Sequence, residues 1–88
     1  MLTESAVMEA LNRVRDRDLN KSIVETGGVK EVTIKENNVS LKIALARTGT
    51  SDQMEIQQEV VGILKGEGAD SVGLRFTELT EEEIQAQG

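Results

Sequence analysis

The sequence predicts an α+β fold, a two-layer sandwich in which helices pack on one face of a three-stranded sheet. Apolar residues recur at helical spacing near the start and in the middle of the chain, and three segments alternate apolar and polar residues as strands do. Capping and turn residues separate these segments. The expected order is α-β-β-α-β with a short final helix, because three strands with one apolar face each can bury those faces under two helices.

The first helix is expected from about residue 4 to residue 15, with Thr3 as its N-cap. Residues 16–28 have no sustained period and predict a loop with room for one helical turn. The loop ends in Gly27-Gly28, where the backbone can turn sharply. The apolar stripe of the helix is Val7, Ala10, Leu11 and Val14.

Strand patterns follow the loop. Val32 and Ile34 indicate a first strand, and Asn37-Asn38 is expected to form the hairpin turn because Asn tolerates positive φ. The third strand is expected at Ser71–Thr77. The second strand has the clearest alternation, with one apolar side made of Val39, Leu41, Ile43 and Leu45.

A second helix is expected at about residues 53–65, because Thr50, Ser51 and Asp52 can all cap it and Thr50 with Gln53 has capping-box spacing. Gln57 interrupts its apolar face. We expect its amide to bond to neighbouring backbone, as buried amides generally do, with contact to a partner as the alternative. The predicted apolar face is wide and comprises Met54, Ile56, Val60, Val61, Ile63 and Leu64.

Another capping box, Thr80 with Glu83, predicts a short acidic helix at the end of the sequence. We therefore divide the chain into an α+β domain at residues 1–79 and an acidic helical tail, or the start of a linker, at residues 80–88.

Composition excludes several classes of chemistry. The 88 residues include no Cys or His, so the thiolates of iron–sulfur clusters and the imidazoles of zinc sites are missing, and so are Cys–His and Ser–His catalytic pairs. The net charge of −6 argues against nucleic acid and anionic membranes as partners of this domain alone. The lack of Cys, of a spanning apolar run and of a signal-peptide pattern favours a cytoplasmic protein.

The candidate site is the loop between the second strand and the second helix, where backbone N–H groups at a helix start attract anions. Arg47 and nearby hydroxyls could join such a site; alternatively, Thr50 and Ser51 only cap the helix while Gly49 makes the turn. The loop does not have the glycine-rich run and lysine of a P-loop. The candidate residues are Arg47, Thr48, Gly49, Thr50, Ser51 and Asp52.

Asp16 and Asp18 form a second, acidic candidate. They could pair as carboxylates or hold a hard cation such as Mg²⁺. Because Arg15 and Arg17 are interleaved with them, the simpler interpretation is a solvated charged loop. An independent enzyme is the weakest interpretation of these aspartates, since no partner base is apparent.

Five segments of the sequence resemble the small iron–sulfur-assembly domain family, which includes PaaD-like and SufT-like proteins and the N-terminal domain of Mrp/ApbC-type cluster-carrier ATPases. The sequence of these segments is most similar to that of the Mrp-type ATPases of Gram-positive bacteria, including SalA-like regulators. The segments are Asp16-Arg17-Asp18-Leu19, Lys21-Ser22-Ile23-Val24-Glu25, Ala44-Leu45-Ala46-Arg47-Thr48-Gly49-Thr50-Ser51, Gln57-Gln58-Glu59-Val60 and Val72-Gly73-Leu74-Arg75-Phe76.

The resemblance implies an adaptor or regulatory domain without a cluster site or nucleotide site of its own. A downstream ATPase domain would carry the ATP and the bridging iron–sulfur cluster, and iron–sulfur assembly or target proteins would be partners. Self-association into a homodimer also stays open. The family's loop cysteine falls at Thr50, the proline after it at Ser51 and the proline of the first motif at Arg17, so no thiolate role transfers to this chain.

Two alternatives remain at this point. The chain could be a stand-alone interaction module of the same family, or the N-terminal domain of a SalA-like transcriptional regulator.

Overall fold

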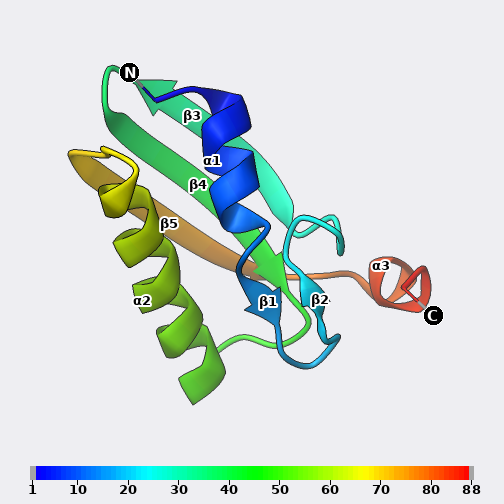
Figure 1. The fold of residues 1–88 in the computed structure, drawn as a ribbon. Coiled ribbons are helices and arrows are strands. Elements are labelled where there is room, and N and C mark those ends of the chain that lie inside the picture. Colours follow the sequence, from blue (N-terminus) through cyan, green and yellow to red (C-terminus); the bar gives the residue numbers. More distant parts are fainter. Residues whose placement is uncertain (1, 88) are drawn as a thin grey trace.

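The computed structural model describes residues 2–87 and confirms the predicted α+β sandwich (Figure 1). The helices and strands follow one another in the order α1-β1-β2-β3-β4-α2-β5-α3. The helices are α1 (Glu4–Leu11), α2 (Ser51–Gly66) and α3 (Glu81–Gln85). The strands are β1 (Arg15–Asp16), β2 (Lys21–Ser22), β3 (Val29–Lys35), β4 (Asn38–Leu45) and β5 (Ser71–Glu78).

The main sheet has the order β3-β4-β5, so β4 is its central strand. β3 and β4 form an antiparallel hairpin, whereas β4 and β5 are parallel and are joined through α2, as a parallel pair requires a crossover connection. Figure 1 shows α1 and α2 on the same face of this sheet. The core between the two layers includes Val7, Leu11, Ile23, Val39, Ile43, Ile56, Val60 and Leu64.

The segment from residue 12 to residue 28 differs most from the prediction. α1 ends at Leu11, and β1 and β2 form a small antiparallel hairpin where a loop was expected. Its turn includes Asn20 in the left-handed region, with φ of 54°. The backbone N–H of Ile23 donates to the carbonyl oxygen of Val14 over 2.9 Å, and Arg15 pairs with Ser22. Val14 and Arg15, which were expected to be helical, are therefore part of the hairpin pairing instead.

The β3–β4 turn also differs in detail. Lys35 pairs with Asn38, so the turn residues are Glu36 and Asn37. Glu36 holds the positive φ, at 58°, that we expected of an asparagine. The apolar alternation of β3 and β4 sets the register of the hairpin, and this register places the turn at Glu36-Asn37 rather than at Asn37-Asn38.

The apolar face of α2 is narrower than predicted. Ile56, Val60 and Leu64 are its buried residues, whereas Met54 is 64% exposed. Gln57 is also exposed, so the expectation of a buried amide was wrong. With only one sheet to cover, α2 buries a single stripe, and residues to one side of that stripe stay in solvent.

Gly27 and Gly28 join the small hairpin to the main sheet. Gly27 has a φ of 75°, which favours glycine. A Cβ on Gly28 would lie 2.4 Å from the carbonyl oxygen of Ala44, so a side chain there would displace the backbone of β4. The carbonyl oxygen of Gly28 instead accepts a hydrogen bond from the Ala44 N–H.

The final helix folds back against the β2–β3 segment. The predicted capping box of Thr80 and Glu83 is present at the start of α3. Glu83 forms an ion pair with Lys30, and the Gln87 side chain donates to the carbonyl oxygen of Thr26 over 3.0 Å. Lys21 donates to the carbonyl oxygen of Gln87 over 2.7 Å. Within residues 2–87, no helix has the length and apolar character needed to cross a bilayer.

Candidate functional site

Asp16 links the β1–β2 hairpin to the end of β4. Its side chain is buried, and the residue is only 3% exposed. One carboxylate oxygen accepts from the backbone N–H of Asp18 at 3.1 Å and of Leu19 at 3.4 Å. The other oxygen accepts from the backbone N–H of Ala46 at 2.8 Å. The interpretation of a solvated charged loop is therefore wrong at Asp16, because backbone donors have replaced water around its carboxylate.

Asp18 lies on the surface and binds Arg47 through two hydrogen bonds. Nε and Nη2 of Arg47 donate to the two carboxylate oxygens of Asp18, each over 2.9 Å. This pairing lowers the pKa of the Asp18 carboxyl and raises the pKa of the Arg47 guanidinium. The bidentate geometry suits a planar guanidinium and fixes the orientation of both side chains. The Arg47 side chain nevertheless remains 69% exposed, so a partner can still reach it.

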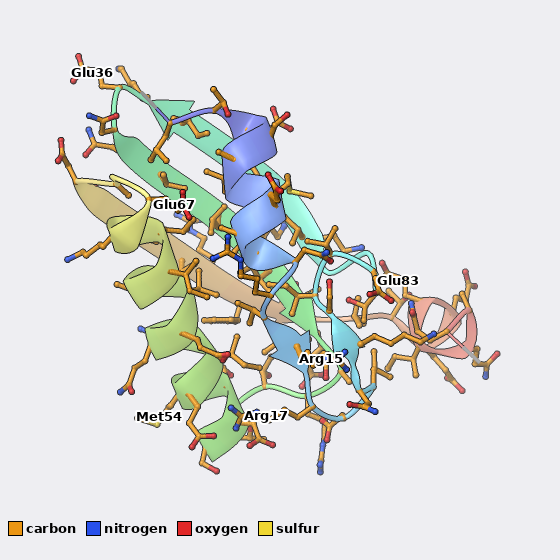
Figure 2. All side chains as sticks on the ribbon, viewed as in Figure 1. Arg15, Arg17, Glu36, Met54, Glu67 and Glu83 are labelled. Carbon is orange, nitrogen blue, oxygen red and sulfur yellow. The ribbon has the colours of Figure 1, made fainter. Side chains whose placement is uncertain are left out.

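Arg17 joins the same hairpin to the first turns of α2. Its Nη1 donates to Asp52 over 3.1 Å and also to Glu55. The hydrogen bonds that Arg17 donates to these carboxylates, first to Glu55 and then to Asp52, raise the pKa of its guanidinium. Figure 2 shows Arg17 beside the N-terminal end of α2. We refer to Asp16, Arg17, Asp18, Arg47, Asp52 and Glu55 together as the clasp.

The loop before α2 directs its polar groups to partners within the chain. The Thr50 side chain caps α2 by accepting from the Gln53 N–H over 3.1 Å. The Gln53 side chain accepts from the Gly49 N–H, one residue before the position that a capping box would use. The Thr48 hydroxyl donates to Glu78 over 3.0 Å. This pattern favours the capping interpretation of the loop over an anion site at the helix start.

Ser51 is the first residue of α2, and its side chain is exposed. Among the described residues, the side-chain oxygen of Ser51 takes part in no hydrogen bond. The loop candidates therefore separate into two kinds: Thr50 holds the helix start, whereas Arg47 and Asp52 take part in the ion pairs of the clasp.

The geometry of the clasp suits protein contact better than catalysis or metal binding. The space between its side chains is about 10 Å³. Both oxygens of Asp16 already accept from backbone N–H groups, and the described residues contain no group of three His, Cys, Asp or Glu side chains placed to hold a metal ion. The donor set also does not fit an iron–sulfur cluster, because the sequence has no Cys or His to ligate it. What the clasp offers is a surface of ordered charged groups.

Two acidic residues of this region, Glu55 and Glu78, were not among the residues predicted from the sequence. Glu55 had a detectable signal, since Asp52, Glu55 and Glu59 recur at helical spacing along one side of α2. Glu78 had none, because it reaches Thr48 only through the parallel pairing that places Leu45 opposite Glu78.

Comparison with known proteins assigns the family. Residues 4–73 match the family model described as iron–sulfur cluster assembly protein. The chain belongs to this family. The α+β domain described above is therefore an iron–sulfur cluster assembly domain.

One relative of this iron–sulfur cluster assembly domain is much longer than the chain. An iron–sulfur cluster carrier protein from Bacillus subtilis (strain 168) is 46% identical over 86 residues, which cover 96% of this chain and 24% of the relative. The chain therefore spans about a quarter of the length of that carrier protein.

Solved structures show the same fold. A crystal structure of a domain of unknown function, DUF59, from Bacillus anthracis superposes with a TM-score of 0.77 at 22% identity, covering 91% of this chain and 81% of that one. A conserved hypothetical protein from Thermotoga maritima has a TM-score of 0.69 at 24% identity, covering 93% and 85% of the two chains.

Proposed function

We propose that this domain acts in the cytoplasm as the N-terminal adaptor of an Mrp/ApbC-type iron–sulfur cluster carrier ATPase, and that it is not itself an enzyme. The observation that carries the proposal is the match of nearly the whole chain to 24% of the length of an iron–sulfur cluster carrier protein. In this proposal the iron–sulfur cluster is cargo held by the rest of the carrier, and ATP is bound there as well.

The clasp is the surface through which we expect the adaptor to dock on its ATPase domain or on a target protein. Arg47 is highly exposed yet oriented by Asp18, so it is a pre-organised guanidinium that can recognise a carboxylate of the partner. Neighbouring Asp52 and Glu55 give the same surface both signs of charge. Such a mixed surface favours specificity and orientation of docking.

Two alternatives stay open within the family. A stand-alone module would have no ATPase attached to it, and a SalA-like regulator would use the same fold in control of transcription. The reading frame that follows Gly88 distinguishes the first of these. A P-loop with its lysine, followed by a Cys-x-x-Cys pair, supports the ATPase, whereas a stop codon supports the stand-alone module.

The docking role is tested with Arg47→Ala. We expect this variant to unfold within about 1 kcal/mol of the parent chain, because an exposed ion pair contributes little to stability. We expect it to bind the ATPase domain, supplied as a separate polypeptide, about tenfold more weakly, since one interfacial charge pair is worth roughly 1.4 kcal/mol or more. Thermal unfolding and titration calorimetry measure the two effects.

Lys65→Ala is the matched control, because Lys65 is an exposed cation near the opposite end of α2. It should change neither measurement. An Arg47 variant that melts several degrees early but binds the ATPase domain normally would make Arg47 a structural residue and remove it from the docking surface.

A further inference from the structure

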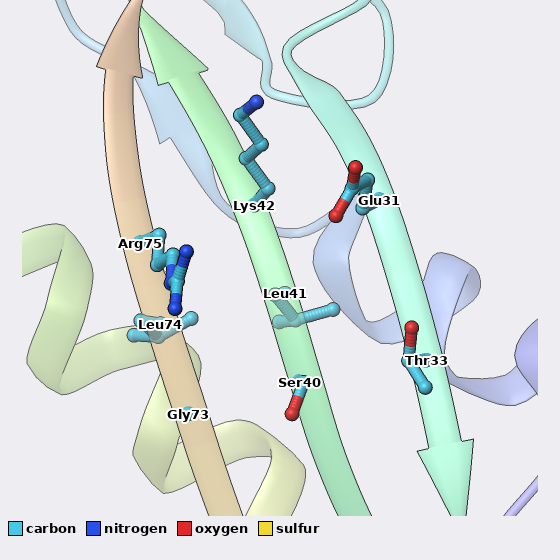
Figure 3. A pocket seen from close by; sticks show the side chains of 8 residues that line it. All are labelled: Glu31, Thr33, Ser40, Leu41, Lys42, Gly73, Leu74 and Arg75. Carbon is cyan, nitrogen blue, oxygen red and sulfur yellow. The ribbon is translucent and has the colours of Figure 1, made fainter.

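The outer face of the sheet, opposite α1 and α2, is a second surface that the clasp does not use. Figure 3 shows it directly, with the helices behind the strands. Small and charged residues, together with Leu41 and Leu74, line a shallow hollow of about 490 Å³. We define the open sheet face by Glu31 and Thr33 of β3, Ser40 and Lys42 of β4, and Gly73 and Arg75 of β5.

Two cations lie side by side on this face. Lys42 is directly opposite Arg75 in the parallel β4–β5 pair, and like charges in that position destabilise a sheet. Glu31 is opposite Lys42 on the other side, but neither Lys42 nor Arg75 forms an ion pair or a side-chain hydrogen bond within residues 2–87. A chain with a net charge of −6 thus keeps two cations side by side on one face, with a single carboxylate, that of Glu31, beside them on the open sheet face.

Gly73 is the third unusual feature, because nothing in the fold requires a glycine there. Its φ lies outside the left-handed region, and a Cβ at this position would meet only ordinary contacts, 3.7 Å from Ser40 Oγ and 3.9 Å from the Val39 carbonyl oxygen. Glycine inside a strand weakens it and is often found where another backbone approaches closely. Gly73 deepens the hollow beside Arg75 without any benefit to the isolated domain.

The uncovered state of β4 and β5 points the same way. Purely parallel sheets are normally covered on both faces, and this mixed sheet contains one parallel pair, β4 and β5. Here α1 and α2 cover one face of the pair, and the outer face between Ser40 and Arg75 is bare within the described residues.

We propose that the open sheet face binds an acidic polypeptide segment, whose carboxylates meet Lys42 and Arg75 and whose backbone lies over Gly73. Charge complementarity selects the occupant. The hydroxyls of Thr33 and Ser40 supply further donors on the floor of the hollow. Two cations are too few to hold a nucleic acid, which binds by neutralising many phosphates and would be repelled by the acidic remainder of the domain. This inference goes beyond the proposed adaptor function and does not depend on the clasp.

The experiment is a titration of the ¹⁵N-labelled chain with a hexaglutamate peptide, followed by amide chemical shifts. We expect saturable changes confined to β3, β4 and β5. Lys42→Gln and Arg75→Gln should each weaken binding about fivefold, the effect of one exposed ion pair. Gly73→Val should weaken it at least as much by filling the hollow, while the domain keeps its melting temperature because Val favours strands.

The controls separate this surface from others. Lys65→Gln removes an exposed cation from α2, and Asp18→Asn removes a carboxylate of the clasp; neither should alter binding of hexaglutamate. Failure of Arg47→Ala to weaken ATPase docking would therefore leave this result untouched. A titration without saturation, shifts centred on α2 or the clasp, unchanged affinity in Lys42→Gln and Arg75→Gln, or equal binding of a hexathymidylate would each overturn the proposal.

Discussion

The clasp and the open sheet face use charged residues in opposite ways. In the clasp, Arg17 binds Asp52 and Glu55, and Arg47 binds Asp18 through two hydrogen bonds. On the open sheet face, Lys42 and Arg75 lie next to each other with no ion pair to another described residue. The first arrangement holds segments of the same chain together, whereas the second leaves its charge available to another molecule.

Topology accounts for this difference. The clasp forms where the β1–β2 hairpin, the end of β4 and the start of α2 converge, so that side chains from distant parts of the sequence can pair. Within residues 2–87, no second layer covers the outer face of the sheet, so the carboxylate nearest in register to Lys42 and Arg75 is that of Glu31 in the sheet itself. The elements that surround a cation therefore decide whether it is oriented by a carboxylate of the same chain, as Arg47 is by Asp18, or lies beside another cation, as Arg75 does.

The largest effect is expected from Asp16→Ala. This change removes the buried acceptor of three backbone N–H groups and leaves them without that partner in part-buried positions. We expect a loss on the order of 3 kcal/mol in the free energy of unfolding, because hydrogen bonds to a buried carboxylate are among the stronger ones. Urea denaturation measures it.

Two further variants compare the stability contribution of Asp16 with that of an exposed clasp residue and that of the open sheet face. Asp18→Ala should lose less than about 1 kcal/mol, because its ion pair is exposed. Arg75→Gln should leave the urea midpoint unchanged or slightly higher, because it relieves the like-charge pair with Lys42. The distinction would fail if Arg75→Gln destabilised the chain as much as Asp16→Ala does.

A smaller effect is expected at the start of α2. Thr50→Ala should cost about 1 kcal/mol, because the Thr50 side chain accepts from the Gln53 N–H and caps the helix. Ser51→Ala is the matched control, since the exposed Ser51 hydroxyl makes no hydrogen bond to any residue from 2 to 87 and the change should be almost neutral. Thermal unfolding of the two variants compares them. Equal losses would mean that the two residues share the cap.

The main sheet and α2 could be predicted from sequence because their signals are local. Alternating apolar residues in β4 and the Thr50 cap of α2 act on neighbours in the sequence. The β1–β2 hairpin could not be predicted, because each of its strands has only two residues and is too short to show an alternation of apolar and polar residues. Its stability comes from tertiary contacts, such as Asp16 with Ala46.

The candidate site was predictable only as a list of residues. Arg47 and Asp18 are 29 positions apart in the sequence, and no spacing rule joins them. Their pairing depends on the β1–β2 hairpin, which places Asp18 beside the end of β4. The open sheet face could likewise not be predicted from the sequence, because the register that places Lys42 opposite Arg75 arises from a parallel crossover.

The smallest effect concerns pH and compares the clasp with the α3 contact. Arg47 lowers the pKa of Asp18 from its ordinary 3.8, and Lys30 together with the Thr80 backbone lowers the pKa of Glu83 from 4.5. Each carboxyl thus binds its proton more weakly in the folded chain than in the unfolded one. Ionisation of these groups therefore stabilises the fold above the ordinary pKa values, and the contribution is lost as pH falls through the lowered ones.

Asp18→Asn and Glu83→Gln test this reasoning, because neither variant can ionise at the changed position. Each should be slightly less stable than the parent chain near neutral pH, and the difference should shrink as pH falls below about 4. Urea denaturation at a series of pH values measures it, and added salt should reduce the same difference because both ion pairs are exposed to solvent. A difference that persists unchanged at the acid end would mean that these side chains stabilise the domain through packing or neutral hydrogen bonds rather than through their charge.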